Sequence, residues 1–210
     1  MRQASHGLSG RLILSTINDP IIRGLLDAFK AAGITPTVWD VTSDVGVAAF
    51  RAVIYDESAD AAAYPYPAAC GAGCHPCRTV AISRALTEAA QSRLTAIAGS
   101  RDDFGRARYA ETQNAHALAS NRRLAHAEGG PLSFDAVPDW DGPSLIAAIE
   151  YVRTRLGAAG LGQILHVPLS DPRLPICVTR IIVPGLEGPT ESAQYYPGAR
   201  VRKRLGLRAS

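Results

Sequence analysis

The stretch from Ala68 to Phe104 constrains this chain more than any other, because a glycine- and cysteine-rich segment runs directly into a long helical pattern. From about Thr79 to Ala98, residues with high helix propensity dominate. Gly99 follows as an ordinary helix C-cap. At roughly 100° of rotation per residue, this helix is predicted to carry one apolar, core-facing stripe. Its members are Ile82, Leu86, Ala89, Ala90, Leu94 and Ile97.

A second stripe of the same helix is polar. Arg84, Glu88, Gln91 and Thr95 fall within an arc of about 60° by the same rotation. Such a stripe is typical of a solvated face with i,i+4 pairs such as Arg84–Glu88, and it is also what a helix presents to a charged ligand. Arg93 projects instead into the apolar arc, where its guanidinium must meet a buried carboxylate or a phosphate, or extend to solvent.

Length and composition indicate a folded protein. The chain has 210 residues, 47% of them hydrophobic, and a net charge of +3. No run approaches the roughly 20 apolar residues of a membrane span, and the first residues have no secretory apolar region. We therefore expect a soluble, cytoplasmic protein that does not contact membranes. The basic residues after Ala199 predict a solvated terminus, and the absence of interleaved aromatic residues argues against nucleic-acid binding.

The order of the predicted elements favours an α+β fold. It indicates a mixed or antiparallel sheet with helices packed on one face. The predicted elements are a strand at 11–17, a helix from Pro20 to about Ala32, a strand pair at 35–41 and 48–55, the helix at 79–98, a weak helix at 104–128, a helix at 143–159, and strands at 163–169 and 176–184. The predicted regions are a lead-in at 1–10, one domain at 11–190 with a mobile segment at 104–142, and a basic tail at 191–210.

Three cysteines precede the central helix in what the sequence indicates is a turn. Cys70, Cys74 and Cys77 have the spacing C-x3-C-x2-C, and with His75 they are candidates for an iron–sulfur or a zinc site. The enzyme class that uses this spacing for a cluster needs many βα units after it, and too few elements follow here. Unliganded loop thiols are therefore the favoured interpretation. Cys177 lies within a strand pattern and is predicted to be a small core residue.

The common nucleotide-binding and hydrolase motifs are absent. The chain has no G-x-x-x-x-G-K-[ST] and no G-x-G-x-x-G between a strand and a helix. The glycines from Gly157 to Gly162 end a helix and predict a C-cap and turn. No G-x-S-x-G elbow and no H-E-x-x-H pair is present either.

Several motifs occur in one order along the chain. The tripeptide Gly73-Cys74-His75 is followed by R-A-L-T-E-A-A-Q-S-R at 84–93 and G-S-R-D-D at 99–103. Supporting stretches are V-W-D-V-T-S-D-V-G at 38–46 and V-P-G-L-E-G-P at 183–189. Together they resemble the YcaO family, and more narrowly the bacterial members that work beside TfuA proteins. The resemblance extends over residues 11–190.

The resemblance implies use of ATP and Mg²⁺ without a P-loop. Family members phosphorylate the oxygen of a peptide-backbone amide, and a nucleophile then replaces that oxygen to give an azoline or a thioamide. The TfuA association points to thioamidation. By this analogy Glu88 and Gln91 are the catalytic candidates: Glu88 holds Mg²⁺ or its waters, and Gln91 hydrogen-bonds substrate or nucleotide. Arg84, Arg93 or Arg101 then faces phosphate.

The resemblance covers only the C-terminal half of such a domain. The family elements S-x-x-x-E-x-x-E-R and N-G-x-A-x-G with its E-x-x-E-R helix have no counterpart here. We therefore expect weak ATP binding by this chain alone. Three interpretations follow: a truncated product, a half that pairs with a separately encoded N-terminal-half protein, or a remnant used as a partner protein. A TfuA-like protein and a second copy of the chain are further candidate partners. The family's Pro-rich azoline-type tail is also missing, which favours thioamidation. The alternatives are a non-catalytic module that binds a peptide or partner, and a metal or iron–sulfur protein using Cys70, Cys74 and Cys77.

Overall fold

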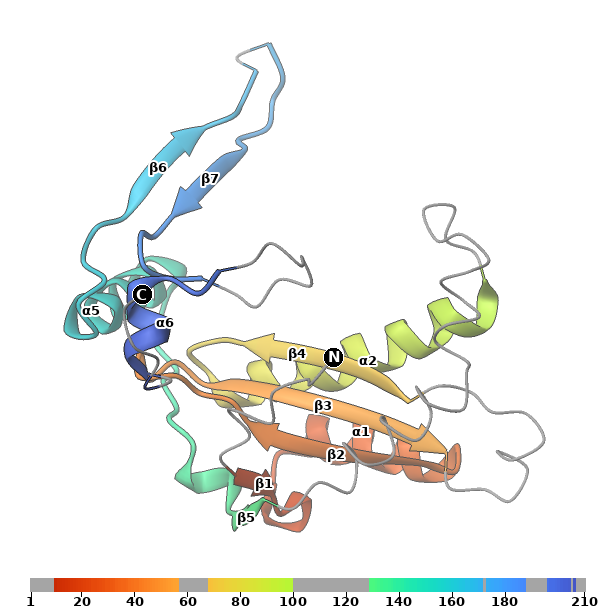
Figure 1. Ribbon diagram of the computed structural model, residues 1–210. Coiled ribbons are helices and arrows are strands. Elements are labelled where there is room, and N and C mark those ends of the chain that lie inside the picture. Colours follow the sequence, from red (N-terminus) through yellow and green to blue (C-terminus); the bar gives the residue numbers. More distant parts are fainter. Residues whose placement is uncertain are drawn as a thin grey trace. The chain divides into compact units, whose positions relative to one another are not determined.

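The principal layer of the protein is a five-stranded sheet in the order β4-β3-β2-β1-β5 (Figure 1). The computed structural model describes residues 10–56, 68–99, 129–171, 173–187, 196–204 and 206. Neighbouring strands are antiparallel except β1 and β5, which run parallel. The strands are β1 (Gly10–Leu12), β2 (Ile34–Asp40), β3 (Ala49–Asp56), β4 (Ala69–Cys74), β5 (Gly130–Leu132), β6 (Leu165–Pro168) and β7 (Thr179–Ile182). The helices are η1 (Leu14–Thr16), α1 (Pro20–Ala31), α2 (Arg78–Ala98), η3 (Phe134–Ala136), α5 (Leu145–Ala158) and α6 (Ala199–Arg204).

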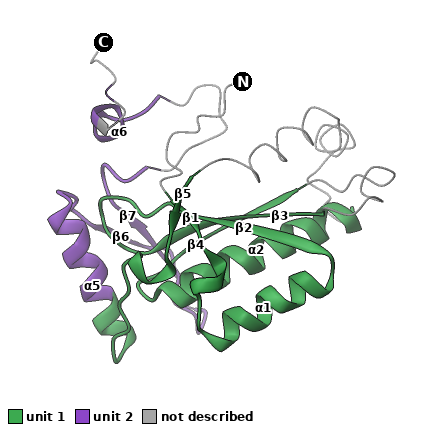
Figure 2. Cartoon of the chain, turned by 90° about the horizontal axis from the view of Figure 1, so that it is seen from below, with its two compact units in different colours: residues 1–148 green, residues 149–210 purple. Residues whose placement is uncertain are grey.

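The chain divides into two compact units, residues 1–148 and 149–210 (Figure 2). The first unit holds the five-stranded sheet with α1 and α2. The second holds most of α5, the antiparallel β6–β7 hairpin and α6. The predicted strands at 163–169 and 176–184 therefore form a sheet of their own. The predicted boundaries of a domain at 11–190, a segment at 104–142 and a tail at 191–210 stay predictions, and residues 104–128 lie outside the described part.

The start of α1 follows the predicted capping chemistry. Asp19 accepts hydrogen bonds from the backbone N–H groups of Ile21 at 2.9 Å and Ile22 at 3.1 Å, and Pro20 occupies the first turn. Gly33, with φ of 68°, ends the helix. The predicted limits of this helix are confirmed.

Strands β2 and β3 form the predicted hairpin, with Val38 opposite Ala52. Their alternating residues divide between two sides of the sheet. Phe50, Ala52 and Ile54 belong to the main core with residues of α1 and α2, whereas Trp39 and Val53 form a smaller buried cluster with Tyr55 on the other side. Both helices lie on one face of the sheet (Figure 2). The predicted α+β class with helices on one face is confirmed.

The glycine- and cysteine-rich segment before α2 is strand β4, so the prediction of a turn there was wrong. Its glycines take part in the β3 ladder, with Gly71 opposite Ala52 and Gly73 opposite Phe50. They share the helix-facing side of the sheet, and each packs against the backbone of α2. A Cβ on Gly71 would overlap the Ala85 carbonyl oxygen, and one on Gly73 would overlap that of Ala81. The glycines are thus required by close helix–strand packing.

We predict that Gly71→Ala destabilises the protein by about 3 kcal/mol, because the added methyl forces α2 away from β4. Gly24→Ala is the matched control, since a Cβ at this position in α1 meets nothing within 4 Å. It is expected to stabilise by about 0.5–1 kcal/mol through helix propensity. Urea unfolding followed by circular dichroism measures both. Equal effects of the two substitutions would contradict the close packing.

The N-terminus of α2 is capped by a residue distant in sequence. Cys77 provides no side-chain cap, and Asp139 instead accepts the Arg78 backbone N–H at 2.9 Å. The Arg78 guanidinium donates to the carbonyls of Asp135 and Val137, pairs with the Asp135 carboxylate at 2.8 Å, and lies 4.8 Å from the centre of the Phe134 ring. This set of contacts, the Arg78 clip, fixes the η3 turn against α2. The segment 131–143, for which the sequence predicted no helix or strand, contributes η3 and part of β5.

Arg78→Lys is predicted to cost about 1–3 kcal/mol, because an ammonium cannot reproduce the several guanidinium hydrogen bonds at once. The melting temperature of the variant reports this loss. Arg153→Lys is the control and is expected to change stability by under about 0.5 kcal/mol, because the Arg153 guanidinium pairs with Glu150 on an exposed helix surface. If Arg78→Lys matched that control, the clip would carry no stabilisation.

Candidate functional site

The exposed surface of α2 carries the polar residues that the sequence singled out. Arg84, Glu88 and Gln91 are exposed, and the first two lie on the flank of α2 that adjoins β4. The side toward the sheet is formed by Ala81, Ala85 and Ala89 with Ile82 and Leu86. Because small residues and glycines bring α2 close to β4, its backbone is held firmly while the polar side chains stay accessible. The structure thus brings Glu88, Gln91 and Arg84 together on one surface.

The C-terminal half of α2 departs from the predicted core stripe. Ile82, Leu86 and Ala89 are buried as expected, but Ala90 is exposed, and so are Leu94 and Ile97, at 65% and 47%. Rotation accounts for Ala90 and Leu94, which each follow a sheet-facing residue, Ala89 and Arg93, by about 100° and so point away from the sheet. Ile97 lies near the end of a helix of about 30 Å, which is longer than the roughly 20 Å of β4.

Arg93 lies on the sheet-facing side, one turn after Ala89. Its Nη2 lies 3.5 Å from Oδ2 of Asp56, at the end of β3, and both side chains are largely buried. The guanidinium that the sequence placed in the apolar arc has therefore found a carboxylate. Arg93 is not on the surface that Glu88 and Gln91 share, and its predicted phosphate contact stays a prediction. Arg101 lies outside the described residues.

Arg84 connects the exposed surface of α2 to the end of β4. Its Nη1 donates to the Cys74 carbonyl at 3.3 Å. Desolvation raises the pKa of the Cys74 thiol, and the positive charge of Arg84 lowers it by a smaller amount. The thiol is therefore kept protonated more strongly than a free cysteine.

We predict that Arg84→Gln raises the pKa of Cys74 further, because the positive charge that favours the thiolate is lost. Less thiolate at a given pH means slower alkylation. Iodoacetamide labelling of Cys74 between pH 7 and pH 10, read by peptide mass spectrometry, measures the shift. Arg23→Gln on α1 is the control and leaves the profile unchanged. A profile moved to lower pH would contradict the assigned electrostatics.

The cysteines do not assemble into a metal site in the described part of the chain. Cys70 and Cys74 are four residues apart in one strand, which separates them by about 13 Å, and Cys77 follows as the residue before α2. Among the described residues no three His, Cys, Asp or Glu side chains gather in a way that would hold a metal ion. The interpretation of the first two as loop thiols was also wrong, since they lie in β4. Cys177, predicted to be a core residue, is exposed because it lies near the open β6–β7 hairpin.

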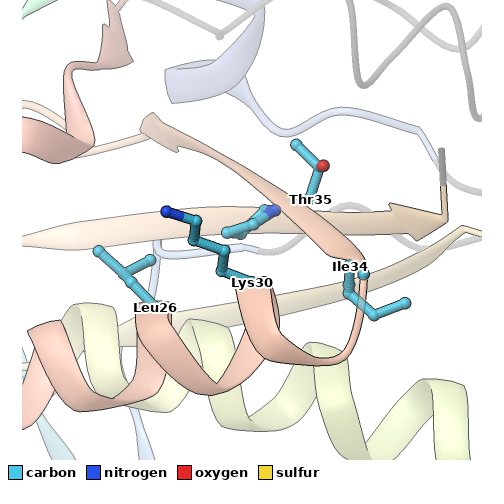
Figure 3. Close-up of a pocket in the computed structure, with 6 residues that line it drawn as sticks. Leu26, Lys30, Ile34 and Thr35 are labelled. Carbon is cyan, nitrogen blue, oxygen red and sulfur yellow. The ribbon is translucent and has the colours of Figure 1, made fainter.

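A hollow of about 380 Å³ lies elsewhere, at the junction of α1 and β2 (Figure 3). Leu26 and Lys30 of α1 lie beside Ile34 and Thr35 of β2 there. It contains one cation and mainly apolar lining, and α2 contributes nothing to it. The sequence offered no signal for it, because a helix end and a strand start become its walls only in three dimensions.

Comparison with known families identifies the class of protein. The family model described as YcaO cyclodehydratase, ATP- and Mg²⁺-binding, matches residues 3–187. The chain therefore belongs to the YcaO family, and the resemblance stated from its motifs is confirmed.

Two relatives support the assignment. A protein of Rhizobium leguminosarum bv. trifolii, described as lying in the tfuA 3′ region, is 38% identical over 202 residues, covering 95% of this chain and 46% of the relative. A Methanothermobacter thermautotrophicus protein is 35% identical over 189 residues, with coverages of 88% and 48%. The chain thus spans about half the length of these two relatives.

Solved structures share the fold. The heterocyclase TruD superposes with a TM-score of 0.69 at 24% identity, covering 95% of this chain and 27% of TruD. A heterocyclase in complex with substrate and cofactor gives a TM-score of 0.67 at 21% identity, with coverages of 85% and 23%. None of the described helices is long and apolar enough to cross a membrane.

Proposed function

We propose that this chain supplies one wall of a Mg²⁺-ATP site in a YcaO domain that activates a peptide-backbone amide. The observation that carries the proposal is the exposed side of α2, where Arg84, Glu88 and Gln91 lie together on a helix fixed against β4. We assign the wall opposite them to the remainder of such a domain, since the chain spans about half the length of two relatives.

The residues on α2 fit half of such a site. Mg²⁺ is commonly held by one or two carboxylates together with phosphate oxygens, and Glu88 offers one carboxylate. Gln91 offers an amide for the nucleotide or substrate, and Arg84 offers a cation for phosphate. When bound, Mg²⁺-ATP would supply the phosphoryl group that turns an amide oxygen into a good leaving group. Arg93 and Arg101 remain further candidates for phosphate contacts.

The open surface of α2 limits what the chain can bind by itself. One carboxylate and one guanidinium on an open helix surface give weak binding, because exposed charges are screened by water. We therefore propose that activity requires the remaining part of a YcaO domain. Thioamidation is the product class we favour, since one relative lies beside tfuA. A peptide is the proposed substrate and a TfuA-like protein a proposed partner.

A non-catalytic role in binding a peptide or partner is the second candidate. It is favoured by the exposure of Glu88 and Gln91. Calorimetry of the isolated chain with Mg²⁺-ATP bears on both candidates, because micromolar binding by this chain alone would argue against a purely structural role and against the need for a second wall.

The decisive measurement is ATP turnover by a complex of this chain with the unmatched part of the Rhizobium relative. Glu88→Ala and Gln91→Ala are each expected to lower turnover about 100-fold or more, because interactions with charge in the transition state are removed. Both side chains are exposed, so circular dichroism spectra and melting temperatures should match the wild type. Asp27→Ala, which removes an exposed carboxylate from α1, is the control and leaves turnover unchanged. Turnover equal to wild type in both α2 variants would refute the site.

A further inference from the structure

The β6–β7 hairpin has an apolar side that nothing in the described structure covers. Leu165 pairs with Ile182 and Val167 with Arg180, and the Leu169 N–H extends the ladder to the Val178 carbonyl at 2.9 Å. Residues directly opposite each other point to the same side of a two-stranded sheet. We call this side the hairpin face. Its apolar members are Leu165, Val167, Leu169, Val178 and Ile182, each 37–52% exposed.

The opposite side of the hairpin is different in character. It carries His166, Pro168, Thr179 and Ile181. On this side an imidazole and a hydroxyl interrupt the apolar residues. On the hairpin face, by contrast, five of the six residues are aliphatic and the sixth is Arg180. The two sides therefore offer a direct comparison within one ribbon.

The hairpin keeps its shape through contacts of its own. The Val178 N–H donates to Ser170 Oγ at 2.6 Å, and Asp171 pairs with Arg173 near the connection. A two-stranded ribbon is nonetheless only marginally stable in water, and it needs a further strand, helix or sheet against its apolar side. An apolar side of this kind typically marks an interaction surface.

Charge distinguishes between possible occupants. Arg180 is the one formal charge among the residues of the hairpin face, and it lies in the middle, opposite Val167. A second copy packed symmetrically on the same surface would bring two guanidinium groups together, which is unfavourable. The occupant is better matched by an apolar surface that carries a carboxylate.

We propose that the hairpin face is the docking surface for the part of a YcaO domain that this chain does not span, with a carboxylate of that part paired with Arg180. About half of each of the two relatives described above has no counterpart in this chain, and that half is the candidate occupant. The proposal rests on the proposed function, because it assumes that this chain is completed by the rest of such a domain.

The test uses two neighbouring isoleucines on opposite sides of β7. Ile182 lies on the hairpin face and Ile181 on the other side, and they are 42% and 54% exposed. The full chain is co-expressed with the tagged, unmatched part of the Rhizobium relative, and the complex is isolated through the tag. Ile182→Asp is expected to raise the dissociation constant at least 10-fold, while Ile181→Asp stays within about 3-fold of wild type. Arg180→Glu is expected to weaken the complex and to make its residual affinity less sensitive to salt.

Folding of each variant is checked by circular dichroism, and both isoleucine variants should retain the wild-type spectrum because the positions are exposed. Equal weakening by Ile181→Asp and Ile182→Asp would overturn the proposal, as would the absence of any complex with the wild-type chain. Light scattering of this chain alone tests for a dimer. A dimer that is lost in Ile182→Asp would assign the surface to a second copy and overturn the proposal. A stable complex whose ATP turnover is unchanged by Glu88→Ala would refute the proposed function but would still support the docking surface.

Discussion

The absence of two side chains on β4 allows α2 to lie directly against the sheet, and the rest of the first unit depends on this contact. Gly71 and Gly73 face the backbone of α2 at Ala81 and Ala85, where any larger residue would overlap it. The interface uses backbone surface and methyl groups and few large side chains. Such packing fixes the rotation of the helix about its axis, because only its small-residue side can approach this closely. Arg84, Glu88 and Gln91 consequently stay exposed.

The packing of α2 against β4 places residues of the 84–93 motif, which are close in sequence, on different sides of the helix. Glu88, Gln91 and Arg84 are exposed, while Arg93, two residues after Gln91, lies on the sheet-facing side and meets Asp56. One short motif therefore serves two purposes. Part of it presents chemistry to a ligand, and part of it ties the far end of the helix to β3. The ion pair spares a largely buried guanidinium the cost of lying unpaired in a poorly solvated position.

The two units differ in how completely they bury their apolar residues. The first has a continuous core between one side of the sheet and two helices. In the second, Leu156 and Leu161 are buried at the end of α5, but the hairpin leaves aliphatic side chains open on both strands. The hairpin face is the surface that we propose for docking of the remainder of a YcaO domain.

Local patterns in the sequence determined the elements whose signals are local. The Asp19–Pro20 cap, the β2–β3 hairpin, the length of α2 and the family motifs required only neighbouring residues to interpret. The tertiary structure alone decided that the glycine- and cysteine-rich segment is a strand, since its glycines are explained by a helix lying above them. It also decided that Asp139 caps α2, because that contact joins residues 61 positions apart. The tertiary structure also decided which residues of the predicted apolar stripe of α2 are buried, since burial depends on which side of a helix the sheet covers as well as on the helix's own sequence.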